Sequence, residues 1–188
     1  MDFRICEITS SSPPDILRAT EQCLDELFPE YAPAHLSKRL SLYGDAGDEP
    51  YIQIFVVRDD ERVLSFVQFL YILVGDRLIC DIDLLGTRRG FRRRGLATGL
   101  FDHAMREADA YAHRYDRALA GVLTLIDHGD EAIRSLHAKK GGQIRTDAPH
   151  PSGDVVVWYP LEAGAREIET RELLGYVDAF GRMIRRFT

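Results

Sequence analysis

The period of the apolar and polar positions changes along the chain. Short runs rich in β-branched and aromatic residues predict strands, whereas apolar residues at three- and four-residue spacing predict helices. The predicted strands are 3–8, 51–57, 63–73, 77–85, 118–126 and 154–159. The predicted helices are 16–28, 34–43, 96–115 and 131–139, followed by one more helix within 165–188.

This order of elements predicts the fold class. Three consecutive strands in 51–85 indicate an antiparallel meander, and the later alternation of strand, helix and strand indicates a crossover. We therefore expect an α/β (α+β) fold with a mixed, mostly antiparallel central sheet flanked by helices. The main domain is expected at residues 1–160, with a C-terminal helical extension at residues 161–188.

An apolar stripe marks the C-terminal extension. Its members recur every three or four residues, as they do in an amphipathic helix. Packing on the core of the domain and a subunit interface in a homodimer are both compatible with this stripe. Its members are Leu173, Leu174, Val177, Phe180, Ile184 and Phe187.

Composition places the chain among folded globular domains. Hydrophobic residues make up 45% and charged residues 29% of the sequence, which are ordinary values for such domains. The longest apolar stretches, such as 63–74, contain polar residues and are shorter than the roughly 18 to 20 residues that span a bilayer. We therefore expect no membrane span. The first 15 residues lack the basic and apolar segments of a secretory signal, so we expect a cytoplasmic location.

Metal-ligating residues are sparse and scattered. Asp127 and His128 are adjacent, but no third ligand follows at a recognisable spacing. We therefore expect no metal. The cysteines are odd in number and far apart, so neither a disulfide nor a thiolate metal site is expected. They are Cys6, Cys23 and Cys80.

Residues 86–101, GTRRGFRRRGLATGLF, place five arginines just before the predicted long helix. The formal net charge of −6 argues against a general nucleic-acid-binding protein, so the arginines serve a local purpose. Backbone N–H groups at a helix start carry the positive end of the helix dipole, and small residues allow close approach. This pattern predicts a phosphate or pyrophosphate site, with a solvated basic loop as the alternative. Neither GxxxxGK[ST] nor an early GxGxxG is present, which disfavours a P-loop or a dinucleotide fold.

Residues 92–97, Arg-Arg-Arg-Gly-Leu-Ala, resemble the [Q/R]xxGx[G/A] signature of the GNAT superfamily of acyl-coenzyme A-dependent N-acyltransferases. The order of elements over about residues 1–160 is similar to the GNAT fold as well. The family's usual VxP is replaced here by Thr87-Arg88-Arg89. The resemblance implies an acetyl-CoA-dependent N-acetyltransferase, with acetyl-CoA as the cosubstrate.

The resemblance also implies which residues contact coenzyme A. Backbone amides from about Arg93 to Thr98 would hold the pyrophosphate, Arg92 would shape the loop, and neighbouring arginines would meet the 3′-phosphate. Backbone N–H groups near Leu85 to Thr87 would contact the thioester oxygen beside a bulge in the strand. The implied coenzyme-binding residues are Leu85, Gly86, Thr87, Arg92, Arg93, Arg94, Gly95, Leu96, Ala97 and Thr98.

Acetyl transfer to an amine requires a base, because an amine with a pKa of about 10.4 is almost entirely protonated at pH 7. Asp81 and Asp83 lie two residues apart on one predicted strand and hence on one face of it. Burial and mutual repulsion move carboxyl groups toward base function. Because GNAT members commonly carry an acid at the position of Asp83, it is the first candidate and Asp81 the second. Solvent exposure or ion pairing with arginines is the alternative for both residues.

The departing thiolate needs an acid, which many GNAT members supply from a tyrosine in a pattern like NxxAxxLYxKxGF. The corresponding run here, DEAIRSLHAKKGGQ, places His137 at the tyrosine position and Asp130 at the asparagine position. Histidine can donate a proton near neutral pH. A structural, half-buried histidine is the alternative. Other candidates for the acid are Tyr71, Tyr111 and Tyr115.

The expected reaction is direct attack of a primary amine on acetyl-CoA in a ternary complex, without a covalent intermediate on Cys80. The acceptor is a small-molecule amine or the amine of a peptide or protein, and acidic residues near the first two helices would favour a cationic one. These acidic residues are Glu26, Glu30 and the acids of the loop 44–50, with Tyr31 beside them. Two other classes remain open: a non-catalytic acyl-CoA-binding or sensing module, and a nucleic-acid-binding module that uses the cluster from Arg88 to Arg94.

Overall fold

The computed structural model describes residues 3–29, 35–40, 52–60, 62–74, 77–148, 150–162, 165 and 167–186. The chain consists of two compact units. The first unit comprises Met1–Leu70 and Asp83–Ala110, and the second comprises Tyr71–Ile82 and Tyr111–Thr188. Two strands and one helix continue from one unit into the other.

The first unit contains the N-terminal strands and helices. β1 pairs antiparallel with β2, and β2 pairs antiparallel with β3. A short 3-10 helix, η1, and the long helix α3 follow β4. The bounds are β1 Arg4–Glu7, α1 Pro14–Leu27, α2 His35–Leu40, β2 Ile52–Arg58, β3 Val63–Val74, β4 Arg77–Thr87, η1 Arg89–Phe91 and α3 Leu96–Arg114.

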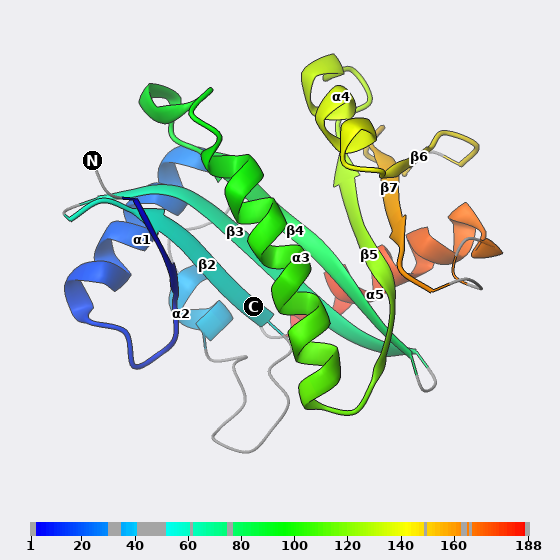
Figure 1. Cartoon of the computed structure of the whole chain (residues 1–188), viewed down its shortest axis with the longest axis horizontal. Helices are drawn as coiled ribbons and strands as arrows, with labels where there is room; N and C mark the ends of the chain where they lie inside the picture. The colour runs from blue at the N-terminus through cyan, green and yellow to red at the C-terminus, as the bar shows by residue number, and fades with distance from the viewer. Residues whose placement is uncertain are drawn as a thin grey trace. The chain divides into compact units, whose positions relative to one another are not determined.

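Helices cover both faces of the strands in the first unit. The ring of Phe55 in β2 lies 4.6 Å from that of His103 in α3. The ring of Phe66 in β3 lies 6.3 Å from that of Phe28, at the end of α1. Because Phe55 is opposite Val67 and side chains alternate along a strand, odd positions of β2 and β3 face α3 and even positions face α1. Figure 1 shows α3 crossing these strands.

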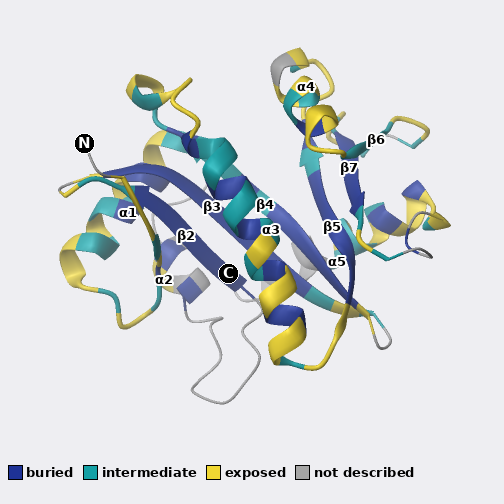
Figure 2. Cartoon of the chain, in the orientation of Figure 1, coloured by how far each residue is buried: buried dark blue, intermediate teal, exposed yellow. Residues whose placement is uncertain are grey.

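This double coverage explains why the strands β2 and β3 are apolar at nearly every position. Ile52–Val57 is buried at every position, and so is 63–71 (Figure 2). A strand that faces water on one side would alternate instead. The polar side chains inside these runs therefore require hydrogen-bond partners or a function.

The second unit contains the C-terminal strands. β4 pairs in parallel with β5, from Arg77 opposite Ala118 to Asp81 opposite Leu123. β5 and β6 each pair antiparallel with β7, so the hydrogen-bonded strand order is β1-β2-β3-β4-β5-β7-β6. The bounds are β5 Ala118–Ile126, α4 Glu131–Lys139, β6 Gln143–Arg145, β7 Val155–Pro160 and α5 Thr170–Arg186.

The C-terminal helix α5 packs into the core of the second unit. Leu173 is fully buried in a cluster with Trp158 and Leu123. The indole Nε1 of Trp158 donates to the carbonyl oxygen of Ala165 at 2.8 Å, which ties the segment before α5 to β7. The side chains of Phe180 and Ile184, and all of Phe187, lie outside the described residues. The division of the chain at residue 160 stays a prediction.

The expected fold class is confirmed, because the sheet is mixed, mostly antiparallel and flanked by helices. The elements η1 and β6 were not predicted as residue ranges. The helix predicted at 34–43 is described only at His35–Leu40. No helix in the described part of the chain is long and apolar enough to cross a membrane.

Candidate active site

The loop between β4 and α3 presents unpaired backbone amides. The first hydrogen bond of α3 runs from the N–H of Gly99 to the carbonyl oxygen of Gly95, at 2.8 Å. The amides of Leu96, Ala97 and Thr98 therefore have no acceptor within the helix. Positive φ angles at Arg93 (63°) and Gly95 (78°) turn the chain into the helix. The result is a group of N–H donors at the positive end of a 19-residue helix.

The two glycines beside these amides face open space within the part of the chain that the structure describes. A Cβ atom built at Gly95 or at Gly99 would meet no atom within 4 Å. Arg92, Arg93 and Arg94 are exposed. A helix N-terminus with open backbone and flanking arginines fits a phosphate or pyrophosphate group. These are the same residues for which the sequence motif implied pyrophosphate binding.

Some of the arginines have partners within the protein. Arg92 Nε donates to the carbonyl oxygen of Thr87 at 3.1 Å, which joins the loop to the end of β4. Arg88 forms an ion pair with Glu26 of α1, with 3.0 Å between Nε and Oε2. The guanidinium of Arg94 lies 5.3 Å from the ring centre of Phe91, within cation–π range. These contacts give the loop a defined shape.

A side chain of β3 holds the end of β4 through hydrogen bonds. Ser65 Oγ donates to the carbonyl oxygen of Gly86 at 2.7 Å and lies 2.8 Å from Thr87 Oγ1. Gly86 faces α1, because a Cβ atom there would lie 3.0 Å from Leu27 and 3.1 Å from Phe28. A Cβ atom here would press on the ends of these two side chains, so glycine favours the close approach of α1.

β4 contains an irregularity between Asp83 and Gly86. Asp83 accepts a hydrogen bond from Gln68, an even position of β3, and so faces α1. Gly86 faces α1 as well. Residues three apart in a regular strand face opposite sides, so this segment holds one extra residue, as a β-bulge does. Leu85 lies within it, in the segment for which the resemblance implied the thioester contact.

The two candidate bases lie in β4, in different surroundings. Gln68 Nε2 donates to Asp83 Oδ2 at 2.8 Å, and Asp83 is partly exposed. Asp81 is only 5% exposed and is opposite Leu123 of β5. The pairing of β4 with β5 runs as far as Asp81, and just beyond it Thr124 Oγ1 donates to the carbonyl oxygen of Ile82 at 2.8 Å.

Gln68 and Thr124 were not predicted as site residues. The available signal was a glutamine inside the apolar run 63–74, since a buried polar residue requires a partner. The predicted strands alone did not reveal that this partner is Asp83. Glu30, Tyr31 and the loop 44–50, which we expected near the acceptor, lie outside the described residues.

His137 lies in α4 of the second unit and is 4% exposed. Its Nδ1 lies 2.6 Å from the hydroxyl oxygen of Tyr159 in β7. Burial lowers the pKa of His137 and raises the pKa of Tyr159, so both groups are uncharged near neutral pH. They share one hydrogen bond, whose donor is set by the imidazole tautomer. Two other candidate acids, Tyr71 and Tyr111, are buried, and their rings stack with 3.8 Å between centres.

The buried cysteines are poor nucleophiles. Burial raises the pKa of Cys80 well above its usual value, with nearby Asp81 as a second cause. Burial likewise raises the pKa of Cys23 to about 12. Because the thiolate is the reactive form, neither thiol is suited to accept an acyl group.

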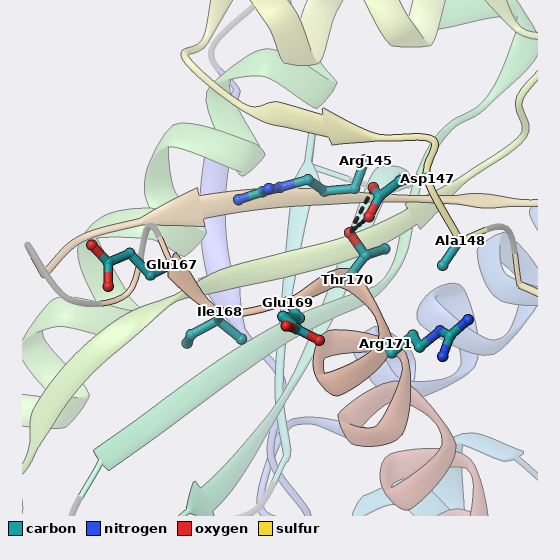
Figure 3. A pocket seen from close by; sticks show the side chains of 8 residues that line it. All are labelled: Arg145, Asp147, Ala148, Glu167, Ile168, Glu169, Thr170 and Arg171. Carbon is teal, nitrogen blue, oxygen red and sulfur yellow. Dashed lines mark hydrogen bonds between the residues drawn. The ribbon is translucent and has the colours of Figure 1, made fainter.

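A separate hollow lies in the second unit, before and at the start of α5 (Figure 3). Its volume is about 510 Å³, and its lining includes Arg145, Asp147 and Arg171. The hydroxyl of Thr170 donates to both carboxylate oxygens of Asp147, at 2.8 and 2.9 Å, and lowers the pKa of Asp147. None of the predicted site residues lines this hollow. Among the described residues, no three potential ligands gather into a metal site.

A family model identifies the class of protein. The model of the acetyltransferase (GNAT) family matches residues 15–139, more than half of the chain. The chain therefore belongs to the GNAT acetyltransferase family and is an acyltransferase. No curated protein matches the sequence significantly.

Solved structures share the fold at low sequence identity. NAA60 of Arabidopsis thaliana in complex with acetyl-CoA is 17% identical, with a TM-score of 0.64 over 85% of this chain and 99% of that one. The ribosomal-protein-S18-alanine N-acetyltransferase of Escherichia coli is 12% identical, with a TM-score of 0.59 over 89% and 99%. Ard1 of Thermoplasma volcanium is 15% identical, with a TM-score of 0.60 over 86% and 99%. The GNAT fold is thereby confirmed.

Proposed function

We propose that the protein transfers the acetyl group of acetyl-CoA to a primary amine by direct attack within a ternary complex. The observation that carries this proposal is the open N-terminus of α3, where the amides of residues 96–98 have no helical acceptor beside exposed arginines. Membership of the GNAT family supports acetyl transfer. NAA60, a structural neighbour, was solved with acetyl-CoA.

The residues at the start of α3 fit the pyrophosphate of coenzyme A. Acetyl-CoA supplies an activated acetyl thioester when it is bound. The amides from Arg93 to Thr98 would hold its phosphates, and Arg92, fixed on Thr87, would keep the loop in shape. Open space at Gly95 leaves the backbone accessible to such a group.

Asp83 is the proposed base, and Asp81 is the second candidate. Asp83 is partly exposed, so an incoming amine can reach it, and Gln68 holds one of its carboxylate oxygens. Asp81 is buried and less accessible. The Asp83 carboxylate would take a proton from the amine and leave a neutral nitrogen with a free electron pair.

We propose His137 as the acid that protonates the departing thiolate. The hydroxyl of Tyr159 orients the imidazole ring of His137. Its lowered pKa makes the imidazolium scarce at neutral pH, so proton donation by His137 would weaken as the pH rises. The raised pKa of Cys80 supports a direct reaction over a covalent intermediate on sulfur.

The acceptor is proposed to be the amine of a small molecule, peptide or protein. Two structural neighbours bear on this choice. NAA60 was solved with a bisubstrate analogue, and Naa50 of Arabidopsis thaliana with the analogue CoA-Ac-MVNAL. Peptides with free N-termini therefore belong in the first acceptor screen.

The test is thiol release from acetyl-CoA with spermidine, lysine and peptides that begin with Ala, Ser or Met. The unaltered protein is expected to acetylate at least one of them. Asp83→Asn should lower kcat/KM by about 100-fold or more. The matched control is Asp127→Asn, the same substitution at the exposed residue after β5, and it should retain full activity.

Two outcomes would contradict the proposal in different ways. If the unaltered protein acetylates no amine, the proposed function is wrong. If Asp83→Asn is as active as Asp127→Asn, acetyl transfer stands and Asp83 is not the base. Asp81→Asn is then the next variant to measure.

A further inference from the structure

Gln68 is a fully buried amide in the middle of β3, between apolar neighbours on both sides. Its Nε2 donates to Asp83 Oδ2 at 2.8 Å. A carboxylate only accepts hydrogen bonds, so the amide nitrogen must be the end that faces Asp83. The carbonyl oxygen Oε1 therefore points away from the carboxylate.

Gln68 Oε1 has no hydrogen-bond partner within the protein. Of the buried side-chain oxygens in the described ranges, it is the only one without a partner. Buried acceptors in native proteins are almost always paired, and an exception calls for a ligand or a functional reason. A partner for Oε1 must carry an N–H or O–H group.

The position of this acceptor relates it to the proposed reaction. Gln68 and Gly86 both face α1, and Asp83 lies on the same side of the strands. The proposed base and the unsatisfied oxygen thus belong to one hydrogen-bonded pair. Only the side-chain amide of Gln68 separates Oε1 from the Asp83 carboxylate, so a donor group bound at Asp83 is close to Oε1.

We propose that, once Asp83 has passed the proton of the ammonium to solvent, Gln68 Oε1 accepts one N–H of the neutral acceptor amine while the Asp83 carboxylate accepts the other, so that Gln68 selects primary over secondary amines. This inference rests on the proposed function. A neutral primary amine has two N–H groups and one electron pair, and it satisfies both oxygens while the electron pair stays free to attack. A secondary amine has one N–H and leaves Oε1 unsatisfied.

The test compares matched acceptors in matched variants. The acceptors are the fastest primary amine of the screen and its N-methyl derivative, each with acetyl-CoA. Gln68→Met removes the amide with little change in side-chain length. The control is Gln53→Met, the same substitution at a buried glutamine of β2 that faces α3 and donates to Glu7.

The unaltered protein and Gln53→Met should prefer the primary amine in kcat/KM by about tenfold or more. In Gln68→Met, this preference should fall by about tenfold, and KM should rise for the primary amine but not for acetyl-CoA. Loss of the Nε2 contact to Asp83 lowers kcat/KM equally for both acceptors, so it cancels in the ratio of the two kcat/KM values. A steric cause of the preference would leave the ratio unchanged.

Gln68→Glu serves as a second variant. It keeps an oxygen at the position of Oε1 and can share one proton with Asp83, so it should retain the preference even at a lower rate. An unchanged ratio in Gln68→Met, or a lost preference in a folded Gln68→Glu, would overturn the inference and leave the proposed function intact. Absence of turnover by the unaltered protein would overturn the proposed function, and this inference with it.

Discussion

The imidazole Nδ1 of His137 lies 2.6 Å from the hydroxyl oxygen of Tyr159, and both side chains are buried. The pair joins α4 to β7 within the second unit. Burial lowers the pKa of the histidine below 6.5, so the folded chain keeps this side chain neutral. This relationship links the stability of the protein to pH.

The first prediction is that acid destabilises the protein through His137. The unfolded chain takes up a proton near pH 6.5, whereas the folded chain does so only at a lower pH. Above pH 6.5, the neutral His137 therefore makes its full contribution to the free energy of unfolding. This contribution is lost as the pH falls toward the pKa of His137 in the folded chain. Denaturant midpoints at pH 7.5 and 5 should differ less in His137→Gln than in the unaltered protein. An equal difference would contradict the prediction, and exposed His113→Gln is the control.

The second prediction concerns the hydroxyl of Tyr159. Tyr159→Phe deletes the hydroxyl oxygen and with it the hydrogen bond to the buried Nδ1 of His137. The free energy of unfolding should fall by about 1 to 3 kcal/mol. Urea unfolding at pH 7.5 measures it. Tyr115→Phe, at a partly exposed residue beyond α3, is the matched control and should change it by less than about 0.5 kcal/mol.

The third prediction tests the packing of α5. Leu173 is fully buried against Trp158. Leu173→Ala should lower the free energy of unfolding by about 2 to 5 kcal/mol, because a cavity remains. Leu161→Ala, at a leucine that is 50% exposed, should lower it far less. Similar losses in the two variants would show that α5 does not pack on this core.

The fourth prediction compares two glycines. A Cβ atom at Gly121 in β5 would overlap the Trp158 ring and lie 2.5 Å from a backbone oxygen, whereas one at Gly175 in α5 would meet no described atom within 4 Å. Gly121→Ala should destabilise the protein by about 1 to 3 kcal/mol, because the core is overpacked. Gly175→Ala should stabilise it by about 0.5 to 1 kcal/mol. Thermal unfolding of both variants measures the difference, and a stable Gly121→Ala would refute the close contact.

Long periodic elements could be predicted from the sequence almost to the residue. α3 was expected at 96–115 and is Leu96–Arg114, and β5 was expected and found at 118–126. β6, Gln143–Arg145, was missed because three partly buried residues carry no period. Its strand conformation comes from pairing with β7, which is a tertiary effect.

In the candidate site, too, one part could be predicted from the sequence and another could not. The amides at the start of α3 could be predicted because the motif is local: the glycine, the arginines and the helix start lie within one short segment. The partnership of Gln68 with Asp83 could not be predicted, because it depends on the register between β3 and β4 and on the irregularity before Gly86. Such a register is set by pairing and turns, not by the residues of one strand.

Coenzyme A binding at the start of α3 is the central claim, and calorimetric titration of coenzyme A and acetyl-CoA tests it most directly. Gly95→Asp places a carboxylate among the amides proposed to hold the phosphates. Gly153→Asp is the matched control, because both glycines have a positive φ, 78° and 90°, and open space around the Cβ position. Both substitutions therefore carry a similar backbone strain.

The unaltered protein and Gly153→Asp should bind both ligands at about micromolar concentration. Gly95→Asp should weaken binding by at least about 100-fold, because like charges repel. Equal binding by Gly95→Asp and Gly153→Asp, or no binding by the unaltered protein, would contradict the account.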